Sequence, residues 1–146
     1  MNDASSMMPT QPVDLIPPGP EDIFVFGSNL SGIHGAGAAA YAANYRGAVW
    51  GVGEGLQGRS YALPTKGLNI THMPITKVKE HVSKFIDFAN DHPELSFQVT
   101  AVGCGLAGWK NEAIAPLFKN APINCRFDTA WKLWMPSHTR FWGTYG

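Results

Sequence analysis

Two glycine-rich stretches, residues 27–37 and 103–108, hold the residue types best suited to chemistry in this chain of 146 residues. Glycine has no Cβ, so a ligand can approach the backbone, and the free N–H groups of such turns can bind an anion. The first stretch runs into an alanine-rich segment, residues 36–45, with high helix propensity. A helix that begins there would direct its positive end at the same point, which favours phosphate.

The glycines of the first stretch have a second interpretation. They match neither G-x-x-x-x-G-K-[ST] nor G-x-G-x-x-G, the two familiar phosphate-binding signatures. A tight turn with small residues for packing a helix on a sheet would contain the same glycines. One such loop is therefore weak support for a ligand site. Its position relative to other loops is better evidence for or against such a site.

Composition restricts the possible partners. Eleven basic and eleven acidic residues cancel, which argues against a duplex or a membrane bound mainly by charge. The two cysteines are too few for a disulfide framework and are not in C-x-x-C spacing, so no metal is expected. No cofactor is indicated either. The chain shows no 18-residue apolar run and no signal peptide, so we expect a cytoplasmic location. The oligomeric state is not indicated.

The pattern of apolar runs predicts an α/β domain over residues 21–146, preceded by a proline-rich, flexible arm, residues 1–20. Strands are expected at residues 23–26, 48–52, 59–64, 97–102 and 123–127, and helices at 36–45, 76–91 and 111–119. Asn111 is a candidate cap for the last helix, and Pro116 predicts that this helix is short or kinked. This order predicts a mixed, mostly parallel sheet with helices on both faces.

Both glycine-rich loops leave the carboxyl end of a predicted strand, the first after Phe26 and the second after Val102. In sheets of this kind, ligands bind outside the carboxyl ends of the strands, where successive loops meet. Two such loops at one sheet edge suit an extended anionic ligand such as a diphosphate.

Three segments in this order resemble the macrodomains, a family that binds ADP-ribose. They are Val25-Phe-Gly-Ser-Asn-Leu-Ser-Gly…His-Gly-Ala-Gly-Ala-Ala, Ser60-Tyr-Ala-Leu-Pro-Thr-Lys66 and Val99-Thr-Ala-Val-Gly-Cys-Gly-Leu-Ala-Gly108. The resemblance covers roughly residues 22–120 and implies a three-layer α/β/α domain. The chain is shorter than a typical member. Its first loop also departs from the family's triple-glycine run by including His34 and Ala36.

The resemblance implies a role for each loop. Asn29 would bond the distal ribose, although it could instead bond the backbone of its own turn. Asp22 would contact the adenine amino group, and the second loop would wrap the diphosphate. The implied ligand-binding residues are Asp22, Gly27, Ser28, Asn29, Gly35, Ala36, Gly37, Gly103, Cys104, Gly105, Leu106, Ala107 and Gly108. The implied ligand is ADP-ribose or a related ADP-ribosyl nucleotide, free or attached to a macromolecule. Nucleic acid is expected only as such a modified substrate.

Catalysis is a separate question. Hydrolytic macrodomains commonly carry an acid after the glycine run, and residues 35–41 contain none. His34 and Glu54 are the candidates to replace it as a base, because imidazole and carboxylate groups both accept protons. The alternatives are a hydrogen-bonding His34 and a solvated Glu54, and Lys66 is either a cation in the cleft or a surface residue.

An ADP-ribosyl hydrolase, an ADP-ribose-phosphate phosphatase and a non-catalytic binding or sequestering module therefore remain open. Two other classes also remain. One is a different nucleotide-binding α/β protein that uses the same two loops. The other is an interaction domain whose glycines serve packing and whose Trp-rich tail, residues 129–146, forms a contact surface.

Overall fold

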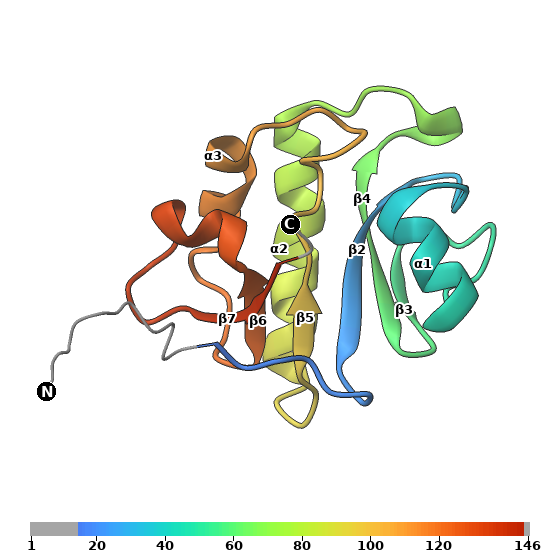
Figure 1. The fold of residues 1–146 in the computed structure, drawn as a ribbon. Helices are drawn as coiled ribbons and strands as arrows, with labels where there is room; N and C mark the ends of the chain where they lie inside the picture. Colours follow the sequence, from blue (N-terminus) through green and yellow to red (C-terminus); the bar gives the residue numbers. More distant parts are fainter. Residues whose placement is uncertain (1–14, 145–146) are drawn as a thin grey trace, which may run out of the picture.

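A six-stranded sheet forms the centre of the computed structural model, which describes residues 15–144 (Figure 1). Its strands are β2 (Ile23–Asn29), β3 (Gly55–Gln57), β4 (Ser60–Lys66), β5 (Phe97–Val99), β6 (Cys125–Asp128) and β7 (Arg140–Gly143). They lie in the order β3-β4-β2-β5-β6-β7, and only β3 runs antiparallel to its neighbour. The predicted α/β class with a mixed, mostly parallel sheet is confirmed.

Helices connect these strands and pack on the sheet. They are α1 (Gly37–Tyr45), α2 (Ile75–Asp91) and α3 (Asn111–Ile114), with 3-10 helices η1 (Leu68–Ile70), η2 (Ala115–Phe118) and η3 (Thr129–Trp134). Within residues 15–144, no helix is both long enough and apolar enough to span a bilayer.

The central strand β2 is buried on both faces, which explains its unbroken apolar run. Phe24 and Phe26 pack with the alanines of α1, including Ala42. Ile23 and Val25 belong to the larger core on the opposite face, which α2 covers. The predicted amphipathic period of α2 is confirmed, since its buried residues are Val78, Val82, Phe85 and Ala89.

The strand expected at residues 48–52 is absent, and this prediction was wrong. The segment is an irregular turn in which Val49 and Trp50 are largely exposed, so their apolar character does not reflect a place in the sheet. The turn is held by Gln57, whose side chain accepts a hydrogen bond from Val49 N at 2.6 Å and donates one to Val52 O at 2.9 Å. Strand β3, which contains Gln57, lies where a loop was expected.

The chain leaves the sheet early after β5. Thr100 donates to Val25 O from both its backbone N, at 3.2 Å, and its Oγ1, at 2.7 Å. These two hydrogen bonds to one carbonyl end the ladder three residues before the predicted end at Val102. The second glycine-rich loop therefore begins closer to β2 than the sequence pattern indicated.

The last predicted helix is short and kinked, as Pro116 indicated, because α3 gives way to the 3-10 helix η2. The expected cap at its start was wrong. Lys110 occupies the cap position, and Asn111 instead accepts a hydrogen bond from Trp131 Nε1 at 3.0 Å. Trp131 is fully buried, so part of the Trp-rich tail belongs to the core.

The described end of the predicted arm is attached to the sheet. Leu15 forms a parallel bridge with Phe141, and Ile16 N donates to Phe141 O at 2.7 Å. Arg126 donates to Ile16 O at 3.2 Å and fastens the segment further. The prediction of flexibility for residues 1–14 lies outside the described residues.

Candidate functional site

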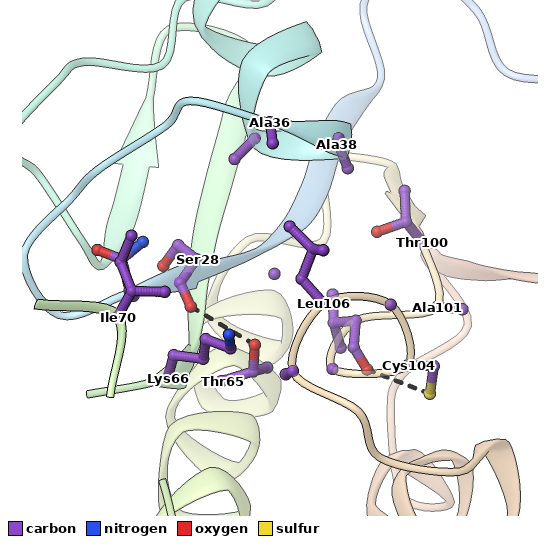
Figure 2. Close-up of a pocket in the computed structure, with 18 of the residues that line it drawn as sticks. Ser28, Ala36, Ala38, Thr65, Lys66, Ile70, Thr100, Ala101, Cys104 and Leu106 are labelled. Atoms are coloured by element: carbon purple, nitrogen blue, oxygen red, sulfur yellow. Dashed lines mark hydrogen bonds between the residues drawn. The ribbon is translucent and has the colours of Figure 1, made fainter. Parts of the chain in front are cut away.

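A pocket with a volume of about 730 Å³ lies at the sheet edge where β2, β4, β5 and β6 end (Figure 2). The first loop and α1 contribute residues 27–29, 33 and 35–39, the second loop contributes residues 100–107, and Thr65, Lys66, Ile70, Asn111 and Asp128 complete the lining. Figure 2 shows Ala36 and Ala38 on one side and Leu106 pointing toward them from the second loop. The two glycine-rich loops thus share one pocket.

The structure places almost all the predicted loop residues in this lining. Those present are Gly27, Ser28, Asn29, Gly35, Ala36, Gly37, Gly103, Cys104, Gly105, Leu106 and Ala107. Gly108 does not line the pocket. Its N–H donates to Gly105 O at 2.9 Å and closes the turn of the second loop.

The first loop rests on the segment that precedes β3. Ser28 Oγ donates to Gly53 O, and a Cβ on Gly53 would lie 2.3 Å from Asn29 O. Only glycine fits at residue 53, since no Cβ can approach a backbone oxygen so closely. The segment that contains Gly53 therefore shapes the pocket by supporting the first loop, although it does not line the pocket itself.

Asn29 is committed to its own loop. Its Nδ2 donates to Ile33 O at 2.9 Å, and its Oδ1 accepts from Ile33 N at 3.0 Å. The side chain is 6% exposed and lines the pocket, with one N–H and one lone pair left over. The geometry agrees with the alternative interpretation, in which Asn29 bonds its own turn.

Helix α1 opens onto the pocket with no side chain capping it. Ala36 at the cap position has no polar side chain, and the first turn of α1 contains no acid. Gly37 has φ +58° and open space where a Cβ would lie, while Ala38 and Ala39 line the pocket beside it. The first N–H groups of a helix have no partner within it, so this end can hold an anion.

The second loop presents backbone N–H groups as well. It is fixed by hydrogen bonds from Cys104 N to Ala101 O at 3.2 Å and from Trp109 N to Gly103 O at 2.9 Å. Among residues 15–144, no acceptor is found for the N–H groups of residues 105–107. These donors and the start of α1 surround the same pocket.

In the described part of the chain, two charged side chains line the pocket, one on β4 and one on β6. Lys66 is the last residue of β4 and pairs in register with Asn29. Its position favours a cation in the cleft over a residue of the outer surface. Asp128 is the last residue of β6 and is 5% exposed.

Cys104 is the only thiol in this lining among the described residues. Burial is the main cause that raises the pKa of its thiol to about 11; a hydrogen bond with Trp131 partly opposes this rise, and the negative charge of Asp128 adds to it. The thiolate is the reactive form of cysteine, so Cys104 is a neutral, weakly nucleophilic group at physiological pH.

Asp22 lies far from the pocket, which argues against its predicted adenine contact. It precedes β2 at the opposite sheet edge, roughly 23 Å along the strand from Asn29. Its carboxylate forms an ion pair with Arg126 and accepts from Gly19 N at 3.0 Å. Asp22 therefore anchors the segment before β2.

His34 and Glu54 also lie outside the lining, so their catalytic assignment gains no support from this geometry. His34 is 1% exposed, and its Nε2 lies 3.0 Å from Val49 O and 3.2 Å from Val52 O. It holds the 49–52 turn against the first loop. Glu54 bonds His81 Nδ1 at 2.7 Å and Lys84 Nζ at 3.3 Å, which ties its loop to α2.

Several lining residues are not among those that the sequence predicted. Asp128 had a usable signal, because it directly follows a predicted strand, as the first loop does. Thr100 and Asn111 flank the second loop and could have been included on the same ground. Ile70 had no such signal, since it reaches the pocket through a left-handed backbone at Asn69 and Ile70, with φ values of 54° and 61°.

Within residues 15–144, no group of three or more histidine, cysteine or acidic side chains is arranged to hold a metal ion. Comparison of the chain with protein-family models, with curated proteins and with solved structures found no match. The function therefore has to be inferred from the pocket itself.

Proposed function

We propose that this protein binds ADP-ribose or a related ADP-ribosyl nucleotide in the pocket at the ends of β2, β4, β5 and β6. The observation that carries the proposal is the convergence of both glycine-rich loops on one cavity at the carboxyl edge of a parallel sheet. On this proposal the domain is a short, macrodomain-like three-layer α/β/α fold, with α1 on one face of the sheet and α2 on the other.

The phosphate-binding capacity comes from backbone donors. The uncapped start of α1 and the N–H groups of residues 105–107 enclose one volume, and Lys66 adds a positive charge near it. Backbone N–H groups and a helix N-terminus together stabilise phosphate without requiring a basic surface. This agrees with the chain's net charge of zero.

The pocket also suits a ligand longer than a single phosphate. Its lining extends over four adjacent strand ends, from Lys66 on β4 to Asp128 on β6. Three intervals between neighbouring strands span roughly 14 Å. The volume of about 730 Å³ falls within the range typical of small-molecule sites. A nucleoside diphosphate with a second sugar has the extended, doubly charged form that such a pocket accommodates.

The function that the geometry supports is binding. Among residues 15–144, Asp128 is the only acid in the lining, and neither His34 nor Glu54 belongs to it. Hydrolysis of an ADP-ribosyl bond requires a group that takes a proton from the attacking water. Neither predicted base lines this pocket. We therefore propose a module that recognises or sequesters the nucleotide, free or attached to a macromolecule.

Calorimetry and thermal unfolding with ADP-ribose, ADP, AMP and NAD test this proposal. We expect ADP-ribose to bind most tightly, because it alone offers both the diphosphate and a free distal ribose. At one hundred times its dissociation constant, it should stabilise the fold by about 2.7 kcal/mol. Absence of binding by all four ligands would refute the proposal. Preference for ADP or NAD would instead support another nucleotide-binding class.

Release of ADP-ribose from modified protein and nucleic acid tests the proposed lack of turnover. We expect no release above that of buffer alone. Release that survives in Glu54→Gln and His34→Ala would show that a different group is catalytic.

A further inference from the structure

We propose that this protein has a second binding site, which takes a small aromatic carboxylate and lies on the face of the sheet that α1 covers. The site is a pocket with a volume of about 490 Å³, lined by residues 18–20, Tyr41, Arg46, Gln98 and residues 142–144. Within residues 15–144, it shares no lining residue with the pocket at the ends of β2, β4, β5 and β6. The inference therefore goes beyond the proposed function and does not depend on it.

The side chain of Gln98 gives this pocket a buried polar group. Its neighbours on β5, Phe97 and Val99, belong to the core that α2 covers, so Gln98 points to the opposite face of the sheet. Gln98 is only 4% exposed, yet among residues 15–144 its amide has no hydrogen-bond partner, and neither amide atom is enclosed by protein. Buried polar side chains are nearly always hydrogen-bonded. The Gln98 amide is therefore a donor and an acceptor that a ligand in the pocket can use.

Arg46 supplies the positive charge of the pocket, and it is the only charged residue in the lining within the described part of the chain. Its Nη2 donates to Asp22 O, which anchors the guanidinium group. Its Nη1 has no partner among residues 15–144 and is not enclosed. The carboxylate of Asp22 forms an ion pair with Arg126, so it does not neutralise Arg46. The pocket therefore favours a ligand with a single negative charge.

Phe24 of β2 brings the two polar groups to one place. It pairs in register with Gln98 of the next strand, β5. The Arg46 guanidinium lies 6.0 Å from the centre of the Phe24 ring, and the Tyr41 ring lies 5.0 Å from it, centre to centre. Gln98, Arg46 and Tyr41 are thus all neighbours of one buried side chain. A ligand in the pocket that they line can meet all three.

Two aromatic side chains from different elements line the same pocket. Tyr41 of α1 is 42% exposed, so much of its ring is open to a ligand. Trp142 of β7 donates from Nε1 to Val99 O at 2.9 Å, which holds its indole at β5 one residue from Gln98. Aromatic rings prefer offset-stacked or edge-to-face contacts with other rings. The lining therefore suits a ligand with a flat aromatic body.

A carboxylate fits these groups better than a phosphate does. The planar guanidinium group of arginine matches the geometry of a carboxylate, and the Gln98 NH₂ group can donate to it as well. One cation balances one negative charge, whereas a phosphate monoester carries more than one at pH 7. Inorganic phosphate also has no flat body for Tyr41 and Trp142 to contact. The combination of charge and aromatic rings indicates an aromatic acid.

Titration of the ¹⁵N-labelled native chain with N-acetylphenylalanine tests the inference, with the neutral N-acetylphenylalanine amide as the matched control. We expect the acid to cause saturable shifts at Gly19, at the side-chain amide of Gln98 and at the indole N–H of Trp142, and none in residues 27–39 or 100–107. The amide should bind about tenfold more weakly, because charge-assisted hydrogen bonds are the stronger ones. Inorganic phosphate should cause no shifts at these positions.

Phenylacetate separates two sources of the same chemistry. Binding of both acids would indicate a free aromatic acid as the ligand. Binding of N-acetylphenylalanine alone would indicate the C-terminal residue of a peptide, which that compound imitates.

Two variants and one control assign the contacts. Arg46→Gln should weaken N-acetylphenylalanine about tenfold, since it removes the charge. Arg59→Gln should leave this affinity unchanged, because Arg59 also donates to a carbonyl of the segment before β2, Pro20 O at 2.7 Å, but does not line the pocket. Gln98→Met keeps a side chain of similar length without the amide and should weaken the acid about fivefold.

Four outcomes would overturn the inference. Absence of saturable shifts with both acids would do so, and this measurement needs no variant to fold. Equal affinity for N-acetylphenylalanine and its amide would also do so, because Arg46 would then not recognise a charge. Equal losses in Arg46→Gln and Arg59→Gln would attribute the effect to the segment before β2 instead of the pocket. Shifts confined to residues 27–39 and 100–107 would place the acid in the other pocket.

Discussion

Replacing Gly105 by valine should block the pocket while leaving the fold intact. Gly105 lines the pocket in the second loop, and a Cβ built on it meets no atom within 4 Å. Its φ lies outside the left-handed region, so a branched side chain causes no backbone strain there. The added methyl groups would occupy space that the diphosphate requires.

The expected size follows from overpacking. A ligand forced to share a filled site loses about 1–3 kcal/mol, by analogy with methylenes inserted into a packed core. That range corresponds to about 5- to 150-fold weaker binding. The free energy of unfolding should change by less than about 0.5 kcal/mol, because the side chain faces open space.

Two other glycines provide matched controls. Gly37 also lines the pocket with open space around its Cβ position, but its φ of +58° strains valine, so Gly37→Val should lose both binding and about 1–2 kcal/mol of stability. Gly19 has open space, lies outside this pocket and has no left-handed φ, so Gly19→Val should lose neither. Calorimetry with ADP-ribose and urea unfolding of all three variants separate the two effects.

Native affinity in Gly105→Val would refute the reasoning, because the second loop would then lie away from the ligand. A large loss of stability in Gly105→Val would refute it differently. It would show that this glycine serves the packing of its loop and not the approach of a ligand.

Three further predictions concern side chains of the pocket. Lys66→Gln should weaken the binding of ADP-ribose about tenfold at low salt and less at high salt. Lys119→Gln, at an exposed residue, should leave binding unchanged. Equal effects of the two substitutions would show that Lys66 does not belong to the site. Asn29→Ala removes both hydrogen bonds to Ile33 and should lower the free energy of unfolding, measured in urea, by about 1–3 kcal/mol. Calorimetry should show that the binding of AMP and of ADP-ribose is weakened alike. A selective loss of ADP-ribose binding would indicate a direct contact with the ribose. Cys104 should react with iodoacetamide about a hundredfold more slowly at pH 8 than an unperturbed thiol. The reaction should become faster as the pH rises toward the thiol pKa of about 11. Rapid labelling at pH 8 would contradict this prediction.

The fold was predictable where the sequence carried a period or an unbroken apolar run. The face of α2 and the doubly buried β2 both follow from such patterns. The expected strand at 48–52 failed because Trp50 is apolar yet exposed, and its segment is set by bonds to Gln57. Apolar content alone does not distinguish a strand from a turn held by a distant side chain.

The pocket was predictable from the rule that ligands bind at the carboxyl ends of parallel strands. That rule identified both loops, and applied to β6 it would also have identified Asp128. The resemblance implied the role of Asp22, and the chemical groups of His34 and Glu54 suggested theirs, yet each of the three is engaged elsewhere by a partner far away in sequence. Such long-range partners leave no local signal, so the residue type suggested a role that the tertiary structure does not support.

Titrating the ¹⁵N-labelled chain with ADP-ribose and following its amide resonances tests the central claim most directly, because it reports both binding and location. We predict saturable shifts concentrated in residues 27–39 and 100–107, with little change at Gly19, Gln98 or Trp142, which lie away from the sheet edge that forms the pocket. Unchanged spectra, or shifts gathered around those distant residues, would contradict the assignment of this pocket.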